Sequence, residues 1–487
     1  MYRTRFSQAL NSLGGASLLA GAVMAACFAA LVPLPSLRGS HVITFLAYFT
    51  LAATAYLIAT LRMERDRIPI GLIWGLALLF RLTLLLTSPT LSDDVYRYIW
   101  DGHLLNQGLN PYALPVDSPE LDAYTIPPRE MVNNAWMASP YLPAAQGFFA
   151  AAVRLVPQSA LVFQVGAALF DLAAGWLVMD ILRRLRLPRR RVLLYLWNPL
   201  VVVEFAHGAH LDAWMIFLVM LAFWLLAREK ADSPRKALYR TGSALALAAA
   251  TLTKIVPVLL VPLFLRRWGW KKALLYAAAL LFAAAPFALT AGWGLLGPLD
   301  GTGLFGATRI YRMYWNYNSS LYHWLEVALS GYPTPGAVPL EVVGEGPGMA
   351  VRLLVSALMA LVSLATLHWT WRLDDPAEKN PRARNLNLLR LASFPLGAYL
   401  LLTPTVHPWY MTVLTPLLPF LLPQEGESPA IRRFAWAWLY FSIAVAFSYL
   451  TYLDPQNLRE FAQVRWLEYL PLLGLLGWAT VRNLPNS

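Results

Sequence analysis

Cysteine and charged residues are both scarce in this chain of 487 residues. The single cysteine, Cys27, lies in an apolar run, so neither a disulfide nor a cysteine-based metal site can form within one chain. The seven histidines are scattered without metal-ligand spacing. Charged residues make up 14% of the chain, whereas soluble domains carry about a quarter. These absences exclude a disulfide scaffold and argue against an ordinary soluble domain.

Hydrophobic residues make up 58% of the chain, and apolar runs recur from end to end. Runs of this length are typical of transmembrane helices. Some are short and rich in Pro or Gly, which is tolerated where a helix packs on protein or lines a cavity. We therefore expect an all-α, polytopic membrane protein in which residues 1–487 form one membrane-embedded domain. The fourteen expected spans are 14–33, 41–62, 69–87, 158–182, 191–206, 209–227, 240–253, 255–265, 272–291, 349–372, 386–404, 408–422, 432–452 and 466–482.

The formal net charge of +12 would suggest a nucleic-acid partner in a soluble protein. Here 28 of the 39 basic residues lie at the termini or in alternate loops between apolar runs, as orientation signals do. We therefore expect no nucleic-acid partner and a multi-pass protein of a cell membrane, the bacterial cytoplasmic membrane being favoured, with both termini cytoplasmic. The long loops 88–157 and 292–348 then face outward, and residues 373–385 form a short cytoplasmic linker.

Two segments of these outer loops have helical patterns. Residues 141–156 are expected to form an interfacial helix. Residues 318–330 place apolar side chains at helical spacing, which fits either a helix on the membrane surface or an ordinary packed helix.

The first outer loop opens with two adjacent carboxylates, Asp93 and Asp94. Adjacent carboxylates repel, which raises one pKa or invites a cation. One of them could act as a general base on a hydroxyl, the pair could hold a divalent metal such as Mg or Mn, or it could simply cap a helix. On a helix, Asp94, Arg97, Tyr98 and Asp101 share one face through i+3 and i+4 spacing. Apart from this alternative, we expect no metal site and no firm cofactor.

Lys254 is the only lysine that lies within an apolar stretch. A lysine at the centre of a membrane helix costs about 2.5–3.5 kcal/mol by insertion scales, so such residues usually pair with or bind a partner. A phosphate is the natural partner. The alternative is that the side chain snorkels to the outer interface.

For other polar residues of the outer side, the sequence leaves two roles open. Arg309 and Arg312 could grip a phosphate bidentately or remain solvated loop charges. His207, His210 and Asp212 could form a metal site, for which a fourth protein ligand is lacking, or a hydrogen-bonded cap at a helix junction, the cap being favoured. His407 with Tyr410 could contact phosphate or sugar, or could cap a helix. The outer aromatic residues could stack on sugars or belong to a membrane belt.

The run from Asp93 to Tyr112, Asp-Asp-Val-Tyr-Arg-Tyr-Ile-Trp-Asp-Gly followed by Gly-Leu-Asn-Pro-Tyr, resembles the first outer loop of GT-C glycosyltransferases. It is most similar to that of bacterial polyprenol-phosphate-mannose-dependent mannosyltransferases. The resemblance covers about residues 70–420. Supporting segments are Ser139-Pro-Tyr-Leu-Pro143, Trp197-Asn-Pro199, His207-Gly-Ala-His-Leu-Asp212, Thr253-Lys254-Ile-Val-Pro257 and His407-Pro-Trp-Tyr410.

The resemblance implies an inverting transfer of a hexose, mannose being favoured, from a polyprenyl-phosphate sugar to a hydroxyl of a lipid-linked or envelope glycan. It places the reaction on the non-cytoplasmic face and gives a loop aspartate the role of base, with Asp93 and Asp94 as alternatives. The leaving lipid phosphate needs cationic stabilisation, expected from Lys254 with an arginine. Substrate contacts are expected from Arg97, Tyr98, Asp101, His103, Tyr112, Tyr141, His210, Asp212, Arg309, Arg312, His407 and Tyr410.

Two alternatives come from other classes of protein. A transporter or flippase of a lipid-linked glycan would also need many helices and buried charge, but it often shows two related halves, and the sequence has no such symmetry. An envelope assembly subunit without catalysis would tolerate mutation of the acidic loop. The sequence leaves the donor sugar, acceptor, linkage and oligomeric state open.

Overall fold

The computed structural model describes residues 15–229, 234–296, 299–330, 348–374, 380–424 and 426–481. Regular secondary structure in these residues is helical, with one isolated bridge between Tyr317 and Thr405, so the expected all-α class is confirmed. The helices of nine or more residues are α2 Gly15–Leu31, α3 Val42–Arg62, α4 Ile70–Leu84, α5 Asp94–Asn106, α6 Pro143–Leu155, α7 Ala160–Arg184, α10 Asp212–Ala227, α11 Lys236–Thr251, α12 Val261–Ala291, α13 Gly306–Tyr314, α14 Leu321–Ser330, α15 Gly348–Leu373, α16 Pro381–Leu402, α18 Pro429–Ala444, η9 Val445–Leu453 and α19 Ala462–Val481.

Short helical segments connect these elements. They are η1 Gly39–His41, η2 Pro119–Tyr124, η3 Pro127–Met131, η4 Arg189–Val192, α8 Leu193–Leu196, α9 Pro199–Val202, the π-helix η5 Val203–His207, η6 Val256–Leu260, η7 Pro408–Val413, η8 Thr415–Leu417 and α17 Leu418–Leu421. Two expected spans, 191–206 and 408–422, consist of such short pieces. Both are rich in buried residues, as expected where irregular backbone packs on protein.

Each expected span contains helical residues, but the count of fourteen is not confirmed. Five helices of the described chain are long and apolar enough to cross a membrane: Gly39–Arg62, Ala160–Arg184, Val256–Ala291, Ala350–Leu373 and Ala430–Leu453. A sixth is added if Pro199–His207 and Asp212–Ala227, which are bent by 120°, form one broken span. The expected spans 255–265 and 272–291 lie almost entirely in η6 and the long α12, which is kinked at Gly269, where φ is 66°.

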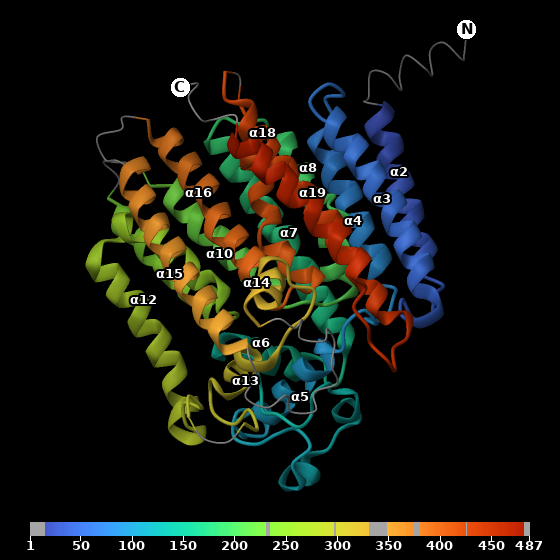
Figure 1. Cartoon of the computed structure of the whole chain (residues 1–487), viewed down its shortest axis with the longest axis vertical. Helices are drawn as coiled ribbons and strands as arrows, with labels where there is room; N and C mark the ends of the chain where they lie inside the picture. The colour runs from blue at the N-terminus through green and yellow to red at the C-terminus, as the bar shows by residue number, and fades with distance from the viewer. Residues whose placement is uncertain are drawn as a thin grey trace.

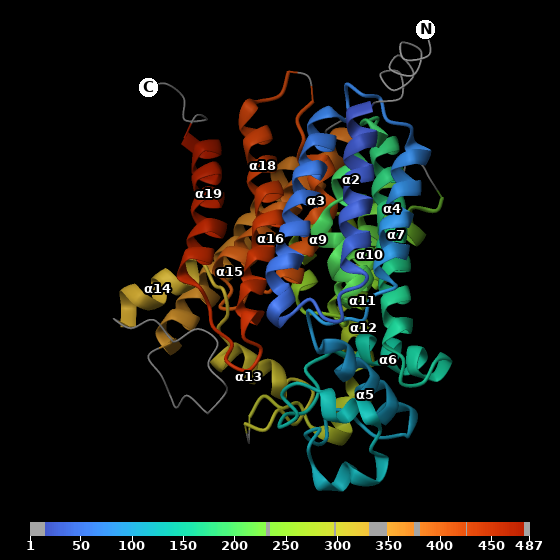
Figure 2. The same cartoon turned by 90° about the vertical axis from the view of Figure 1, so that its right-hand side faces the viewer.

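Helices that follow one another in the chain pack side by side, as in α2 with α3, α10 with α7 and α11, α15 with α16, and α18 with α19 (Figures 1 and 2). Because lipid is as apolar as a protein core, such contacts depend on close packing and internal polar bonds. The Nε atom of Arg81 on α4 donates to Asp171 on α7 at 2.6 Å, and the Arg81 guanidinium also donates to the carbonyl of Leu196.

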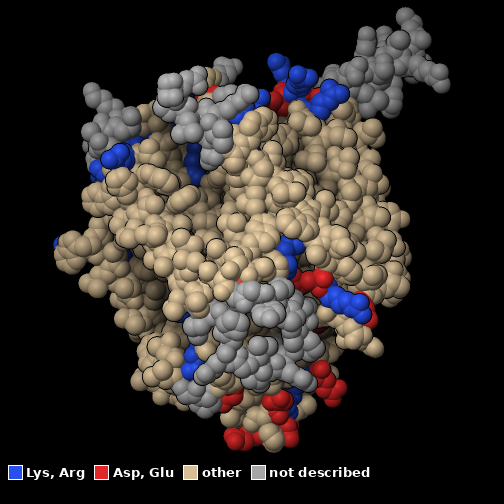
Figure 3. Space-filling model, in the orientation of Figure 1, with Lys and Arg blue, Asp and Glu red and all other residues tan. Residues whose placement is uncertain are grey.

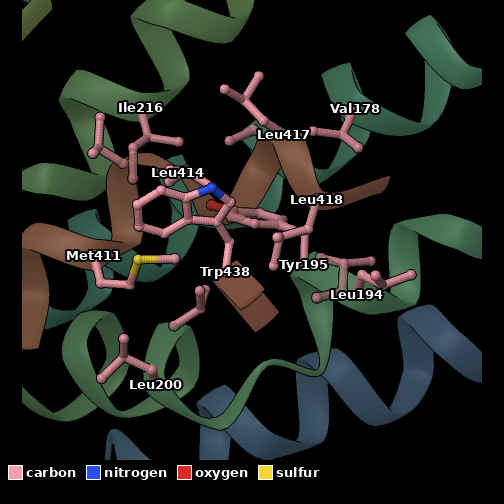
Figure 4. Close-up of a cluster of buried hydrophobic side chains, with 14 of the residues drawn as sticks. Val178, Leu194, Tyr195, Leu200, Ile216, Met411, Leu414, Leu417, Leu418 and Trp438 are labelled. Carbon is pink, nitrogen blue, oxygen red and sulfur yellow. The ribbon is translucent and has the colours of Figure 1, made fainter. Parts of the chain in front are cut away.

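The centre of the bundle is filled by side chains from elements far apart in sequence (Figure 4). Trp438 of α18 is 2% exposed, and the ring of Trp438 lies so close to α16 that a Cβ at Gly397 would meet it at 2.4 Å. Glycine at this position therefore allows α16 and α18 to approach. Residues around Trp438 in this core are Val178, Leu194, Tyr195, Leu200, Ile216, Met411, Leu414, Leu417 and Leu418.

The described parts of the two predicted outer loops lie at the same end of the molecule, around α5, α6 and α13 (Figures 1 and 2). The amide of Ala138 donates to the carbonyl of Asp300, and the amide of Gly303 donates to that of Tyr112. The helices expected at 141–156 and 318–330 are confirmed as α6 and α14. Residues 297–298 and 331–347 of the second loop and 375–379 of the expected linker lie outside the described residues, as do the first fourteen residues with Arg3 and Arg5.

Charge is distributed unevenly between the two ends (Figure 3). Lys and Arg gather at the end opposite α5, Asp and Glu gather mainly around the α5 end, and uncharged surface forms a broad belt between them. Exposed carboxylates of the α5 end include Asp117, Glu120, Asp122 and Glu130. The arrangement agrees with the charge bias of the sequence, and the orientation itself stays a prediction.

The orientation can be tested with single cysteines in a Cys27→Ala background. We expect Glu120→Cys to react with a membrane-impermeant thiol reagent in intact spheroplasts, because positively charged loops stay in the cytoplasm and the acidic end then faces outward. Arg65→Cys, exposed in the loop between α3 and α4 at the basic end, should react only after lysis. Labelling of Arg65→Cys before lysis, with Glu120→Cys protected, would reverse the orientation.

Candidate active site

A cavity of about 1130 Å³ lies where the helix bundle meets the outer-loop elements. Its wall combines the start of α5, the start of α10, the turn between α11 and η6, and parts of α13, η7 and η9. Seven of the predicted site residues line it: Asp93, Asp94, Tyr141, Asp212, Lys254, His407 and Tyr410. The fold thus brings together residues separated by more than 300 positions in the chain.

Helix α5 begins at the acidic pair for a local reason. The Ser92 hydroxyl accepts the amide hydrogen of Asp94 at 3.2 Å, which satisfies a free donor at the helix start. A carboxylate in the first turn is also favoured by the helix dipole. The helix ends at Asn106, and Gly108 follows with φ of 79°, a common way to terminate a helix. Both carboxylates are therefore placed at the cavity by the start of α5.

The two carboxylates have different partners. Asp93 is paired with Arg38, whose guanidinium lies 3.0 Å from the Asp93 oxygens and over the ring of Tyr452. Asp94 Oδ2 instead faces the buried ring of His210, with 3.9 Å between that oxygen and Nδ1. Burial raises the pKa of the Asp94 carboxyl above that of an ordinary aspartate, while the charge of Lys254 opposes this rise. Asp94 is thus the carboxylate without a direct cationic partner in the described chain.

Lys254 is held by an ion pair at the cavity wall. Its Nζ donates to Asp212 Oδ2 at 2.6 Å and lies 5.4 Å from the centre of the Tyr410 ring. Asp212 is almost fully buried, whereas a fifth of the Lys254 side chain remains exposed. An ammonium group has three N–H donors, so donors remain for a ligand in the cavity.

Four aromatic rings form a continuous stack beside this pair. His210 stacks on Trp409 with 4.1 Å between ring centres, Trp409 stacks on His407 at 4.4 Å, and His407 stacks on Tyr317 at 4.7 Å. His207 has a separate role, since its ring bonds to Thr87 and accepts the amide hydrogen of Thr90. The stack therefore fixes His407 at the cavity and His210 directly behind the cavity wall.

Arg97, Tyr98 and Asp101 do not line the cavity; they hold α5 in place. Arg97 donates to the carbonyls of Met137 and Ala138 and lies 3.3 Å from Asp101. Asp101 also accepts hydrogen bonds from Ser139 and from Gln146, the latter at 3.2 Å. All of these side chains are buried.

Aromatic and loop residues complete this packing. Tyr98 stacks on Phe149 at 4.6 Å and meets the Tyr141 ring edge-on. The Tyr112 hydroxyl donates to the carbonyl of Tyr141, and a ring nitrogen of His103 bonds to the carbonyl of Tyr124. Tyr141 is the member of this group that reaches the cavity.

Arg309 and Arg312 of α13 do not line the cavity, although Thr308, Ile310 and Tyr311 of the same helix do. Arg312 is exposed and bonds to the Ser356 hydroxyl at 3.3 Å. The arginines that line the cavity are Arg38 and Arg459. Roles in substrate contact for residues away from the wall stay predictions.

Arg38 and Trp409 line the cavity, and Glu204 lies behind it beside His210, but none of the three was predicted. Glu204 carries a signal, because an ionisable residue within an expected span is by default a functional candidate. Arg38 is a basic residue in a short segment expected on the outer side, which is a weaker signal. The stacking of Trp409 depends on the fold and has no signal in the sequence.

Metal binding by Asp93 and Asp94 stays a prediction. Within the described ranges, no group of three or more His, Cys, Asp and Glu side chains is arranged to hold a metal ion. The ion pair with Arg38 also occupies Asp93.

Comparison with known proteins identifies the family. The family described as alpha-(1->6)-mannopyranosyltransferase, N-terminal domain, matches residues 7–270, more than half of the chain. The chain belongs to this family. The resemblance to mannosyltransferases seen in the sequence motifs is thereby confirmed.

Two curated relatives are similar over part of their length. The chain is 27% identical over 355 residues to alpha-(1->6)-mannopyranosyltransferase A of Mycobacterium tuberculosis (strain ATCC 25618 / H37Rv), covering 67% of this chain and 61% of the relative. It is 27% identical over 156 residues to alpha-(1->6)-mannopyranosyltransferase B of Corynebacterium glutamicum, covering 30% of this chain and 24% of the relative. The chain thus spans less than two thirds of either relative, and no solved structure matches it.

The buried ion pair between Arg97 and Asp101 on α5 gives a stability prediction. We expect Asp101→Asn to lower stability by about 3–5 kcal/mol, because it leaves the buried Arg97 without its ionic partner. Asp122→Asn, which removes the exposed partner of Arg129, should cost less than about 1 kcal/mol. Unfolding of both purified variants in the same detergent measures the difference. Equal stability of the two, with altered substrate affinity in Asp101→Asn alone, would favour direct substrate contact instead.

Proposed function

We propose that this protein is a membrane glycosyltransferase that transfers a mannosyl group from a polyprenyl-phosphate donor to a hydroxyl of a lipid-linked or envelope glycan. The observation that carries the proposal is the shared cavity of Asp94 and Lys254 in a chain of this family. A base and a cation are the two groups that such a displacement requires, one for the incoming hydroxyl and one for the leaving phosphate.

Lys254 is the proposed partner of the donor phosphate. One of its donors is used by Asp212, which holds the ammonium group at the cavity wall, and two donors remain for a ligand. The neighbouring Ile255 is 49% exposed and lines the same cavity with Val256 and Leu299. An apolar wall beside a phosphate-binding cation suits a lipid-linked donor, because the lipid can remain in apolar surroundings.

Asp94 is the proposed base. Burial raises its pKa, which increases its affinity for the hydroxyl proton, and its exposed fifth lies in the cavity. The base accepts the proton of the acceptor hydroxyl as the oxygen attacks the anomeric carbon, and the lipid phosphate leaves from the opposite side. This in-line geometry inverts the anomeric centre. The amides of Asn133, Asn134 and Asn457, which also line the cavity, suit the hydroxyl groups of a glycan acceptor.

The proposal includes the placement of the protein in the membrane. Residues of both predicted outer loops, such as Asn134 and Tyr311, line the cavity, so donor and acceptor would meet on the non-cytoplasmic face. Fourteen spans, with both termini in the cytoplasm, remain part of this proposal. The basic end and the uncharged belt support it (Figure 3).

Replacement of the proposed phosphate ligand should separate binding from folding. We expect Lys254→Met to weaken donor binding at least about tenfold, because a charge-assisted contact to phosphate is lost. The control is Lys236→Met, which removes a lysine paired with Glu229 outside the cavity. Binding of a radiolabelled polyprenyl-phosphate mannose to the purified variants measures the effect.

The same variant has a second readout. Because the charge of Lys254 lowers the pKa of Asp94, its removal should move the acid limb of the pH–rate profile to higher pH. The base must be deprotonated to act, so activity would then be lost earlier on acidification. Unchanged donor affinity and an unchanged profile would return Lys254 to the snorkelling alternative.

Single substitutions should distinguish the two carboxylates. We expect Asp94→Asn to reduce transfer about 10²–10⁴-fold while donor binding persists, because an amide cannot accept the proton. Asp93→Asn should have a much smaller effect, since Asp93 is already occupied by Arg38. Transfer from labelled polyprenyl-phosphate mannose to octyl α-mannoside measures both.

Other results would indicate a different role for the pair of Asp93 and Asp94. A metal held by the pair predicts that both variants lose activity and that added Mg²⁺ or Mn²⁺ partly restores it. A helix cap alone predicts a stability loss of about 1 kcal/mol with near-normal turnover. Near-normal transfer by Asp94→Asn would overturn Asp94 as the base.

A further inference from the structure

Behind Asp94, a histidine and a second carboxylate form a buried row. His210 Nδ1 lies 3.9 Å from Asp94 Oδ2, and His210 Nε2 lies 3.3 Å from Glu204 Oε2. The side chains of His210 and Glu204 are fully buried. Within the described part of the chain, neither ring nitrogen of His210 has a hydrogen-bond partner. Buried polar groups are normally satisfied, so this imidazole between two carboxylates requires an explanation.

The backbone around η5 keeps Glu204 and His210 close to each other. Glu204 and His207 lie in the π-helix η5, and such π-helical turns are frequent at functional sites. The amide of His210 donates to the carbonyl of Glu204, which closes the loop between the two residues. A Cβ at Gly208 would meet that same carbonyl at 2.7 Å and the His210 ring at 2.8 Å, so only glycine fits between them.

Side-chain contacts fix the two ends of the row. Trp409 stacks against the His210 ring and prevents it from rotating out of the row. The hydroxyl of Tyr449 donates to both oxygens of Glu204, at 2.9 and 3.0 Å. Asp94 at the other end keeps a fifth of its side chain exposed and lines the cavity, so this end of the row is open to substrate.

We propose that His210 and Glu204 form a proton relay that temporarily stores the proton taken up by Asp94. The relay rests on the proposed role of Asp94 as base. The acceptor O–H bond breaks and an O–H bond forms on Asp94. That proton then moves to His210 Nδ1, the proton on His210 Nε2 moves to Glu204, and Asp94 is again a carboxylate. After product release, the same steps in reverse return the proton through Asp94 to the cavity.

The relay explains features that a structural role leaves unexplained. A neutral imidazole has one N–H donor and one acceptor nitrogen, which is the arrangement needed to pass a proton from one carboxylate to another. The hydroxyl of Tyr449 offsets part of the cost of burying Glu204 as a carboxylate, which is the form able to receive the proton. Because Glu204 and His210 do not touch the cavity, they act as positioning residues through Asp94.

The test uses purified full-length protein, labelled polyprenyl-phosphate mannose and octyl α-mannoside. His210→Phe keeps a ring for the stack on Trp409 and removes both nitrogens. Glu204→Gln keeps the size of the side chain and removes proton acceptance. We expect each to lower kcat about tenfold or more with the donor KM little changed. Glu468→Gln, the same change at a buried glutamate bonded to Asn318 outside the cavity, is the control and should leave kcat unchanged.

The pH–rate profile provides the readout that a structural role would not move. A proton resident on Glu204 blocks the relay, so Glu204→Gln should shift the acid limb to lower pH. Tyr449→Phe removes a donor to the Glu204 carboxylate and should shift the limb to higher pH. Several other charged or titratable groups face the row, and all of them except Tyr449 in Tyr449→Phe are kept in every variant. They include Lys254, Asp93, Asp212, His207, His407, Tyr141, Tyr452 and Tyr449.

Each outcome of these experiments either supports or overturns the relay or the base on which it rests. Opposite shifts in Glu204→Gln and Tyr449→Phe support the relay. Wild-type kcat and an unmoved limb in His210→Phe and Glu204→Gln, while Asp94→Asn is inactive, overturn the relay and leave the proposed function intact. If Glu204→Gln or His210→Phe does not fold, Tyr449→Phe alone decides, because an unmoved limb there also overturns it. Full activity of Asp94→Asn would instead overturn the proposed role of Asp94 as the base.

Discussion

The ion pair between Lys254 and Asp212 is the constraint on which the site depends. Charges within a largely uncharged bundle are costly unless they are paired, and this pair lies where two helical elements are interrupted. Asp212 begins α10, directly after the 120° bend of the broken span, and Lys254 lies between α11 and η6. One short contact therefore joins two breaks in the bundle and leaves a cation at the cavity wall.

Another part of the cavity wall is the start of α5, and α5 is held in place by groups outside the cavity. Arg97 and Asp101 connect one face of α5 to the loop at Met137–Ser139, while Tyr98 packs into an aromatic cluster with Phe149. These contacts leave only the first turn of α5 facing the cavity. In the sequence, the α5 face that carries Arg97, Tyr98 and Asp101 looks suited to substrate. In the structure, these residues mainly orient Asp94 in the first turn of the helix.

The sequence predicts the helical class, nearly every helical segment and the grouping of the two outer loops, because apolar periodicity and charge bias are local properties. It also identifies Lys254 and the acidic pair, since a lysine in an apolar run and adjacent carboxylates are unusual on their own. The direction in which Arg97 and Asp101 point could not be predicted, because i+4 spacing fixes a shared face but not what covers that face. The pairing of Arg38 with Asp93, 55 positions away, is set by tertiary packing alone.

The same tertiary packing makes two adjacent aspartates chemically different. Neighbouring residues at a helix start project in different directions, so Asp93 reaches Arg38 and Tyr452 while Asp94 faces His210 and the buried interior. Asp93 is paired with a guanidinium, whereas Asp94 has lost water and lacks a direct cation, so Asp94 binds a proton more readily than an ordinary aspartate does. Environments that separate two carboxylates in this way commonly assign them separate roles. The fold therefore distinguishes Asp94, the proposed base, from Asp93 through their different partners, which the sequence of two adjacent aspartates does not reveal.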